Sequence, residues 1–143
     1  MIYFDTSFLV PLFLEEATSK RIELLIGNLP AGEAATSHWT RSEFSSVLAR
    51  EVRMGGLEAD EAREVDSEFE KVLVDSFNVL LPERNDFDLA KQYLARHHNG
   101  LRAGDALHLA IATNCGARTI YSLDKTFLKA GAALALPVSG APR

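Results

Sequence analysis

The chain has 143 residues, of which 47% are hydrophobic and 24% are charged, a balance that is typical of a folded globular protein and excludes a disordered one. Its 15 Lys and Arg residues against 20 Asp and Glu residues leave a net charge of −5, which excludes a generally basic coat protein for nucleic acid because such binding depends on phosphate neutralisation by cations. The single cysteine, Cys115, excludes an internal disulfide framework and a cysteine-based zinc site, so a reducing, cytoplasmic compartment is expected.

The hydrophobic pattern predicts strands and helices that alternate along the chain. In chain order it predicts a strand over 1–4, helices over 8–16 and 17–26, a strand over 34–37, helices over 40–54 and 57–75, a strand over 78–81, helices over 86–97 and 101–112, a strand over 118–122, a short helix around Phe127 and Leu128, and a last strand over 134–138. Such alternation is typical of a parallel sheet covered by helices on both faces. We therefore predict an α/β fold with about five short strands, and we expect residues 1–143 to form one domain.

Two details of these helices depend on single residues. Pro11 is compatible with helix 8–16 because proline is tolerated in a first helical turn. Asn85 or Asp86 is expected to cap helix 86–97, since both residue types accept hydrogen bonds from free backbone N–H groups.

The apolar N-terminal segment is not expected to be a targeting signal or a membrane span. Residues 2–4 and 8–14 are apolar, but the segment has no basic flank and carries Asp5 in its middle. It is also far too short to cross a bilayer. An acid inside such an apolar run therefore needs another explanation.

Four acidic residues occupy positions that are compatible with a functional site. Asp5 follows the first strand and Asp124 follows strand 118–122, and ligand sites in parallel sheets form beyond the carboxyl ends of the strands. Glu43 borders the apolar face of its helix, and Asp105 lies in the first turn of a helix that is apolar nearly all round. Each acid also has a plain structural explanation, as a helix cap, a solvated rim residue, a partner of the helix dipole or a turn former.

A parallel topology allows these four carboxylates to meet at one end of the sheet. Such a cluster needs a compensating cation, because like charges brought together are costly. Oxygen ligands without His or Cys favour Mg²⁺ or Mn²⁺ over zinc or copper. An ion held in this way typically serves hydrolysis of phosphodiester bonds, since it polarises a phosphoryl oxygen and lowers the pKa of water.

Four segments of the chain carry a resemblance to a known family. They are Ile2-Tyr3-Phe4-Asp5-Thr6-Ser7, Ser42-Glu43, Arg102-Ala103-Gly104-Asp105-Ala106-Leu107-His108-Leu109-Ala110 and Ser122-Leu123-Asp124-Lys125-Thr126-Phe127. Together and in this order they resemble the signature segments of PIN-domain ribonucleases, and most closely the VapC-type toxins of bacterial toxin–antitoxin pairs. The resemblance extends over essentially the whole chain and implies a PIN-domain fold.

The resemblance also implies a role for individual residues and for partners. It places the catalytic metal ligands, for Mg²⁺ or Mn²⁺, at Asp5, Glu43, Asp105 and Asp124, with a supporting hydroxyl group at Thr6 or Ser7. Ser122 stands where the family more often has threonine. The implied function is that of a cytoplasmic endoribonuclease with an RNA substrate. The implied assembly is a homodimer with a cognate VapB-type antitoxin, whose C-terminal tail covers the acidic groove.

Three basic residues are candidates for RNA contact because each lies within three residues of a predicted ligand: Arg41, Arg102 and Lys125. They are equally well explained as scattered surface charges. The apolar residues from 8 to 14 exceed what one helix face can turn inward. This excess indicates either a partner surface or a core on both faces.

Several alternatives stay open at this point. A catalytically silent PIN-like module that binds RNA or protein is the alternative to an enzyme, although the presence of all four acids argues against it. A haloacid-dehalogenase-type phosphatase is disfavoured because Ser7 replaces the second aspartate that it needs. His108, on the same helix face as Asp105, is either a core histidine or a supporting residue of the site. Cys115 is expected to be a small core or helix-end residue.

Overall fold

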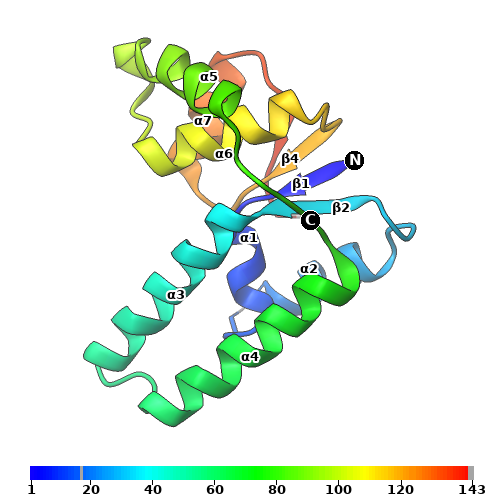
Figure 1. Cartoon of the computed structure of the whole chain (residues 1–143), viewed down its shortest axis with the longest axis vertical. Helices are drawn as coiled ribbons and strands as arrows, with labels where there is room; N and C mark the ends of the chain where they lie inside the picture. Colours follow the sequence, from blue (N-terminus) through cyan, green and yellow to red (C-terminus); the bar gives the residue numbers. More distant parts are fainter. Residues whose placement is uncertain (17, 142–143) are drawn as a thin grey trace.

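The structure is a computed structural model that describes residues 1–16 and 18–141. Strands and helices alternate along the chain, as Figure 1 shows. In chain order the elements are β1 (Ile2–Phe4), α1 (Thr6–Leu9), the 3-10 helix η1 (Val10–Leu12), α2 (Ser19–Gly27), β2 (Ala34–Ser37), α3 (His38–Arg53), α4 (Ala59–Ser76), β3 (Asn78–Leu80), α5 (Arg84–Leu94), the 3-10 helix η2 (His97–Asn99), α6 (Ala103–Asn114), β4 (Thr119–Tyr121), α7 (Lys125–Ala133) and β5 (Val138–Ser139).

Within the described residues, five strands form one parallel sheet in the order β3-β2-β1-β4-β5. Tyr3 of the central strand pairs with Ala35 of β2 on one side and with Ile120 of β4 on the other. The chain moves outward from β1 to β3 and then crosses to β4, so the strand order reverses between β1 and β4. The predicted α/β fold with a parallel sheet is confirmed, and its reversal point is where open α/β sheets hold their ligands.

Alternate residues of β1 point into two separate cores, because successive side chains of a strand face opposite sides of the sheet. Ile2 and Phe4 pack into a core that includes Phe44 and is covered by α1 to α4. Tyr3 packs on the opposite face, with Leu109 of α6 and with residues of α7. Figure 1 shows the two helical layers on either side of the sheet. The helices therefore cover both faces, as the sequence predicts.

Helices α3 and α4 lie side by side as a long arm that reaches away from the sheet (Figure 1). Phe44 of α3 stacks on Phe69 of α4 with ring centroids 3.9 Å apart. Phe13 packs edge-on against both rings. Such aromatic contacts add to the gain from apolar burial, and they fix the rotation of α3 about its axis. That rotation decides where the neighbouring Glu43 points.

The predicted helix over 8–16 is wrong at both ends. The Asp5 carboxylate accepts a hydrogen bond from the Phe8 backbone N–H at 3.0 Å, so α1 already begins at Thr6. Pro11 lies in the first turn of η1, which ends at Leu12, and residues 13–16 are not helical. Residue 17, where the next predicted helix begins, lies outside the described residues.

Two further boundaries differ from prediction. Glu83 rather than Asn85 or Asp86 caps α5, because the side chains of Glu83 and Asp86 form a reciprocal capping box with the backbone. That helix also ends before residue 97. The last strand is only Val138–Ser139 instead of 134–138. Residues 134–136 form the turn that closes α7, in which Ala135 has a φ of 60° and the Leu136 N–H donates to the Gly131 carbonyl. The short helix predicted around Phe127 and Leu128 is longer than expected, since α7 runs from Lys125 to Ala133. The remaining predicted elements are confirmed, with ends shifted by at most two residues. None of the helices in the described ranges combines the length and the apolar character needed to span a bilayer.

Candidate active site

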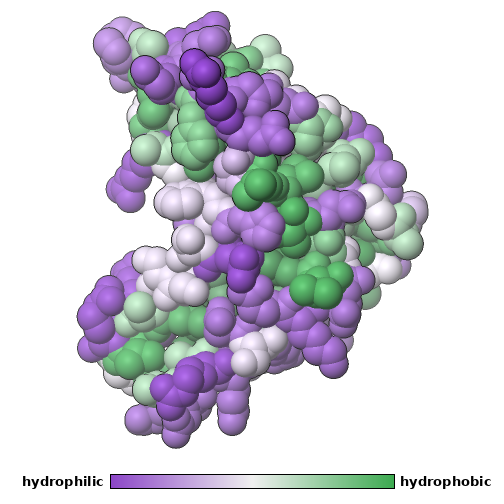
Figure 2. Space-filling model, in the orientation of Figure 1, coloured by the Kyte–Doolittle hydropathy of each residue, from purple (hydrophilic) through white to green (hydrophobic). Residues whose placement is uncertain are grey.

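A cavity of about 300 Å³ opens beside the carboxyl ends of β1 and β4, at the reversal point of the sheet. Figure 2 shows the surface hollowed between the α3–α4 arm and the opposite helical layer. The lining comprises Asp5, Thr6, Ser7, Val10, Glu43, Ser46, Val47, Asp105, His108 and Asp124. The fold thus brings all four predicted acids to one cavity, together with both predicted supporting hydroxyl groups.

Asp5 is held rigidly at the bottom of this site, with only 2% of its surface exposed. Its Oδ1 accepts hydrogen bonds from the Phe8 backbone N–H and from the Ser7 hydroxyl, the latter at 2.8 Å. Its Oδ2 accepts a hydrogen bond from the Ser122 hydroxyl at 2.6 Å. Burial raises the pKa of Asp5 above its ordinary value, and these hydrogen bonds oppose the rise. Asp5 is therefore both a helix cap and a fixed carboxylate of the cavity.

Glu43 on α3 has one carboxylate oxygen held by two donors. The Thr6 hydroxyl donates to Oε1 at 2.7 Å, and His108 Nε2 is hydrogen-bonded to the same oxygen. Burial alone would raise the pKa of Glu43, but the hydrogen bonds from His108 and Thr6 reverse that effect and lower it. A carboxylate on an exposed rim would not be oriented in this way.

Asp105 and Asp124 complete the acidic lining from the first turn of α6 and the start of α7. Burial raises the pKa of Asp105 to about 6, and the carboxylates of Asp124 and Asp5 add to that rise. Asp124 is the N-cap of α7, because its Oδ1 accepts hydrogen bonds from the backbone N–H groups of Thr126 and Phe127 at 2.8 and 3.1 Å. Asp124 therefore keeps its plain structural role while it lines the cavity.

The lining of the cavity, taken over residues 1–16 and 18–141, includes no Lys or Arg that would balance its negative charge. Among the described residues, no three His, Cys, Asp or Glu side chains stand close enough together to hold an ion as they lie. Oxygens of Asp5 and Glu43 are instead drawn to hydrogen-bond donors of the protein. The donor set of carboxylate and hydroxyl oxygens nevertheless fits a hard cation such as Mg²⁺ or Mn²⁺. Burial first, and then the carboxylates of Asp124 and Asp5, raise the pKa of Asp105, and a cation beside these acids would oppose that rise.

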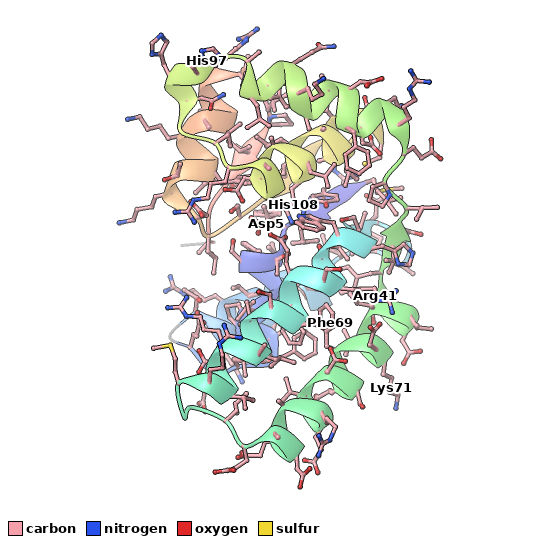
Figure 3. The ribbon with its side chains drawn as sticks, turned by 60° about the vertical axis from the view of Figure 1, so that its left-hand side comes forward. Asp5, Arg41, Phe69, Lys71, His97 and His108 are labelled. Carbon is pink, nitrogen blue, oxygen red and sulfur yellow. The ribbon has the colours of Figure 1, made fainter. Side chains whose placement is uncertain are left out.

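The three basic candidates for RNA contact lie outside the lining of the cavity. Arg41 Nε is hydrogen-bonded to Glu70 of α4 at 2.9 and 3.1 Å, and Figure 3 shows Arg41 beside α4, apart from His108. Arg102 is the N-cap residue of α6, Lys125 is the first residue of α7, and both are exposed. Only these two flank the turns that carry Asp105 and Asp124.

Sequence reasoning did not foresee two of the residues that hold the site together. Ser122 at the end of β4 is fully buried and donates to Asp5, and Tyr3 of β1 is hydrogen-bonded to His108 at 2.7 Å. A tyrosine in a buried strand was the available signal for the second contact, because its hydroxyl group must find a partner in the interior. The role of the four acids as metal ligands stays a prediction.

Comparison with known proteins identifies the family of the chain and finds solved structures of similar fold. The family model described as PIN domain matches residues 2–133. No match was found among curated proteins. Among solved structures the chain is similar to VapC20 of Mycobacterium tuberculosis, a toxin that cleaves the sarcin–ricin loop, at 22% identity and a TM-score of 0.72, over 92% of this chain and 95% of that one. It is also similar to FitAcB of Neisseria gonorrhoeae, at 17% identity and a TM-score of 0.76, over 96% of each chain. The chain is also similar to VapBC2 of Rickettsia felis, which was solved bound to a fragment of promoter DNA, at 16% identity and a TM-score of 0.70, over 99% of this chain and 100% of that one.

Proposed function

Because the chain belongs to the PIN domain family, we propose that it is a divalent-metal-dependent endoribonuclease that hydrolyses RNA phosphodiester bonds. We propose further that it is the toxin of a toxin–antitoxin pair and acts in the cytoplasm. The observation that carries the enzymatic proposal is the convergence of Asp5, Glu43, Asp105 and Asp124 on one cavity, whose lining in the described part of the chain has no Lys or Arg. The family match over residues 2–133 supports a single PIN domain over residues 1–143.

The four acids would hold Mg²⁺ or Mn²⁺, which when bound supplies polarisation of a phosphoryl oxygen and a lowered pKa of water. Ser7 and Ser122 keep the Asp5 carboxylate in one orientation. Thr6 does the same for Glu43. Asp105 and the second carboxylate oxygen of Asp124 make no hydrogen bonds to described side chains. These oxygens would therefore be able to bind the ion without first breaking a contact within the protein.

RNA would reach the cavity along its positively charged flanks. Arg102 and Lys125 are exposed. Arg102 lies shortly before Asp105 in the chain, and Lys125 directly follows Asp124. Arg41 would first have to release Glu70 before it could contact a phosphate. With a net charge of −5, attraction for RNA must be local, and selectivity would come from the shape of an exposed single-stranded segment.

The proposed partners are a VapB-type antitoxin and a second copy of the chain. Solved complexes of similar fold include a toxin–antitoxin complex from Klebsiella pneumoniae and VapBC-1 from nontypeable Haemophilus influenzae, and the unbalanced acids would attract a basic side chain on an antitoxin tail. A second cavity of about 530 Å³, lined mainly by apolar residues including Trp39 and Leu94, supports a homodimer. Phe87 and Leu81 beside it are 51% and 69% exposed.

Cleavage of RNA by the purified protein tests the proposal directly. A fluorescent single-stranded RNA is expected to be cut with Mg²⁺ or Mn²⁺ and to stay intact with chelator. Asp105→Asn is expected to abolish cleavage, whereas the exposed Asp75→Asn on α4 serves as the matched control. RNA that binds but is not cut at any metal concentration would favour the alternative, a catalytically silent PIN-like binding module.

A further inference from the structure

A buried chain of polar side chains connects the central strand with Glu43 of the cavity. The Tyr3 hydroxyl is hydrogen-bonded to His108 Nδ1 at 2.7 Å, and His108 Nε2 is hydrogen-bonded to Glu43 Oε1. Tyr3 and His108 are 0% and 1% exposed. Figure 3 shows His108 lying close to Asp5, between the two helical layers. Three elements, β1, α6 and α3, thus meet through this one imidazole ring.

The Tyr3 hydroxyl fixes the orientation of the His108 ring. Burial raises the pKa of Tyr3, so its hydroxyl group keeps its proton. This hydroxyl is hydrogen-bonded to His108 Nδ1 at 2.7 Å, and the nearby Ser37 hydroxyl is a further hydrogen-bond partner that lowers the pKa of Tyr3. Anchored at Nδ1, the ring directs Nε2 at Glu43.

That orientation of the ring suits the contact with Glu43. An N–H at Nε2 donates to the carboxylate, whereas a bare Nε2 would face it as a second acceptor. The Thr6 hydroxyl donates to the same Oε1 from the other side at 2.7 Å. Oε2 makes no hydrogen bond to the described residues and lies near Gly104, where an added Cβ would stand 3.2 Å from it. One oxygen is thus held by the protein and the other is left for the cavity.

We propose that Tyr3 and His108 are positioning residues of the site: the Tyr3 hydroxyl holds the His108 ring at Nδ1, and His108 Nε2 holds Glu43 Oε1, which leaves Oε2 for a bound divalent cation. This inference rests on the proposed function, because Glu43 is taken as a metal ligand. Groups that orient a ligand in this way change metal affinity about 10- to 100-fold when they are removed. A histidine that served only to fill the core would have no such effect.

Calorimetric titration with Mn²⁺ separates these two roles. We expect His108→Leu to weaken Mn²⁺ binding about 10- to 100-fold and Tyr3→Phe about 10-fold, although Tyr3 does not contact the cavity. His108→Gln should regain most of the affinity, because its amide N–H takes the place of Nε2–H. The double variant should bind no more weakly than His108→Leu alone, since both changes break one chain of contacts. Tyr121→Phe on β4 is the matched control, because its hydroxyl group makes no hydrogen bond to the described residues.

Nitrogen-15 spectra of the histidine rings give a second readout that needs neither RNA nor metal. Tyr3→Phe is expected to shift both ring-nitrogen signals of His108, because it removes the hydroxyl group bonded to Nδ1 and loosens the contact of Nε2 with Glu43. Unchanged spectra and unchanged Mn²⁺ affinity in Tyr3→Phe would overturn the inference. If the wild type binds no Mn²⁺, the proposed metal role fails, and the spectra still decide whether Tyr3 controls His108.

Discussion

Replacing Asp105 by asparagine is expected to stabilise the metal-free protein at neutral pH. Burial and the carboxylates of Asp124 and Asp5 raise the pKa of Asp105 from 3.8 to about 6. In the unfolded chain the carboxyl group loses its proton near pH 4, whereas in the folded chain it keeps the proton until about pH 6. Because the folded state then binds more protons, stability is lost as the pH rises between these values and stays reduced above them.

The size of the effect follows from the same shift. The rise from 3.8 to about 6 would correspond to about 3 kcal/mol for a group shielded from water. Asp105 is only half-buried, so solvent screening reduces the expected gain of the asparagine variant to about 1 kcal/mol. For a chain of this length, a gain of about 1 kcal/mol raises the melting temperature by roughly 3 °C.

Thermal melts with chelator at pH 4 and pH 7, and at pH 7 with Mn²⁺, measure this. Asp105→Asn should melt higher than the wild type at pH 7 with chelator and about equally at pH 4. Mn²⁺ should stabilise the variant less than the wild type, because an ion that binds only the folded state stabilises it by mass action. Asp75→Asn, on an exposed part of α4, should follow the wild type throughout. An Asp105→Asn variant that melts no higher at pH 7 would refute the idea that burial and the neighbouring acids make a charged Asp105 costly in the folded protein.

Four further outcomes are expected. Glu43→Gln should abolish RNA cleavage and leave the melting temperature within a few degrees of the wild type, measured with fluorescent RNA and by calorimetry. Gly104→Ala should lower Mn²⁺ affinity about 10-fold, because its Cβ would stand 3.2 Å from Glu43 Oε2, whereas Gly27→Ala, with nothing within 4 Å, should not. Expression of the wild-type protein alone should slow bacterial growth, and Asp5→Ala should relieve this effect. Normal growth of cells that contain soluble wild-type protein would count against the toxin proposal. Phe87→Asp should shift a dimer to monomer in analytical ultracentrifugation, while an unchanged sedimentation coefficient would place any dimer contact elsewhere.

Local patterns in the sequence were sufficient for the layout of the fold. The run Ile2-Tyr3-Phe4 followed by Asp5 marks a buried strand and its exit, because strand burial and helix capping depend on residues within a few positions of one another. The same local rule placed Asp124 after β4. Helix ends were less accurate, as at Glu83, because several neighbouring residues were able to cap α5 and packing selected one.

The sequence was enough to predict a parallel α/β sheet and four acids that such a topology can bring to one end of it, since strand exits in such a fold share an edge. The strand order and the contacts that hold those acids became visible only in the folded structure. Ser122 binds Asp5, His108 binds Glu43, and Arg41 is paired with Glu70 rather than directed at the cavity. Such contacts join residues far apart in the chain and depend on how each helix is rotated against the sheet. That rotation is set by the packing of the whole core, and no short stretch of sequence encodes it.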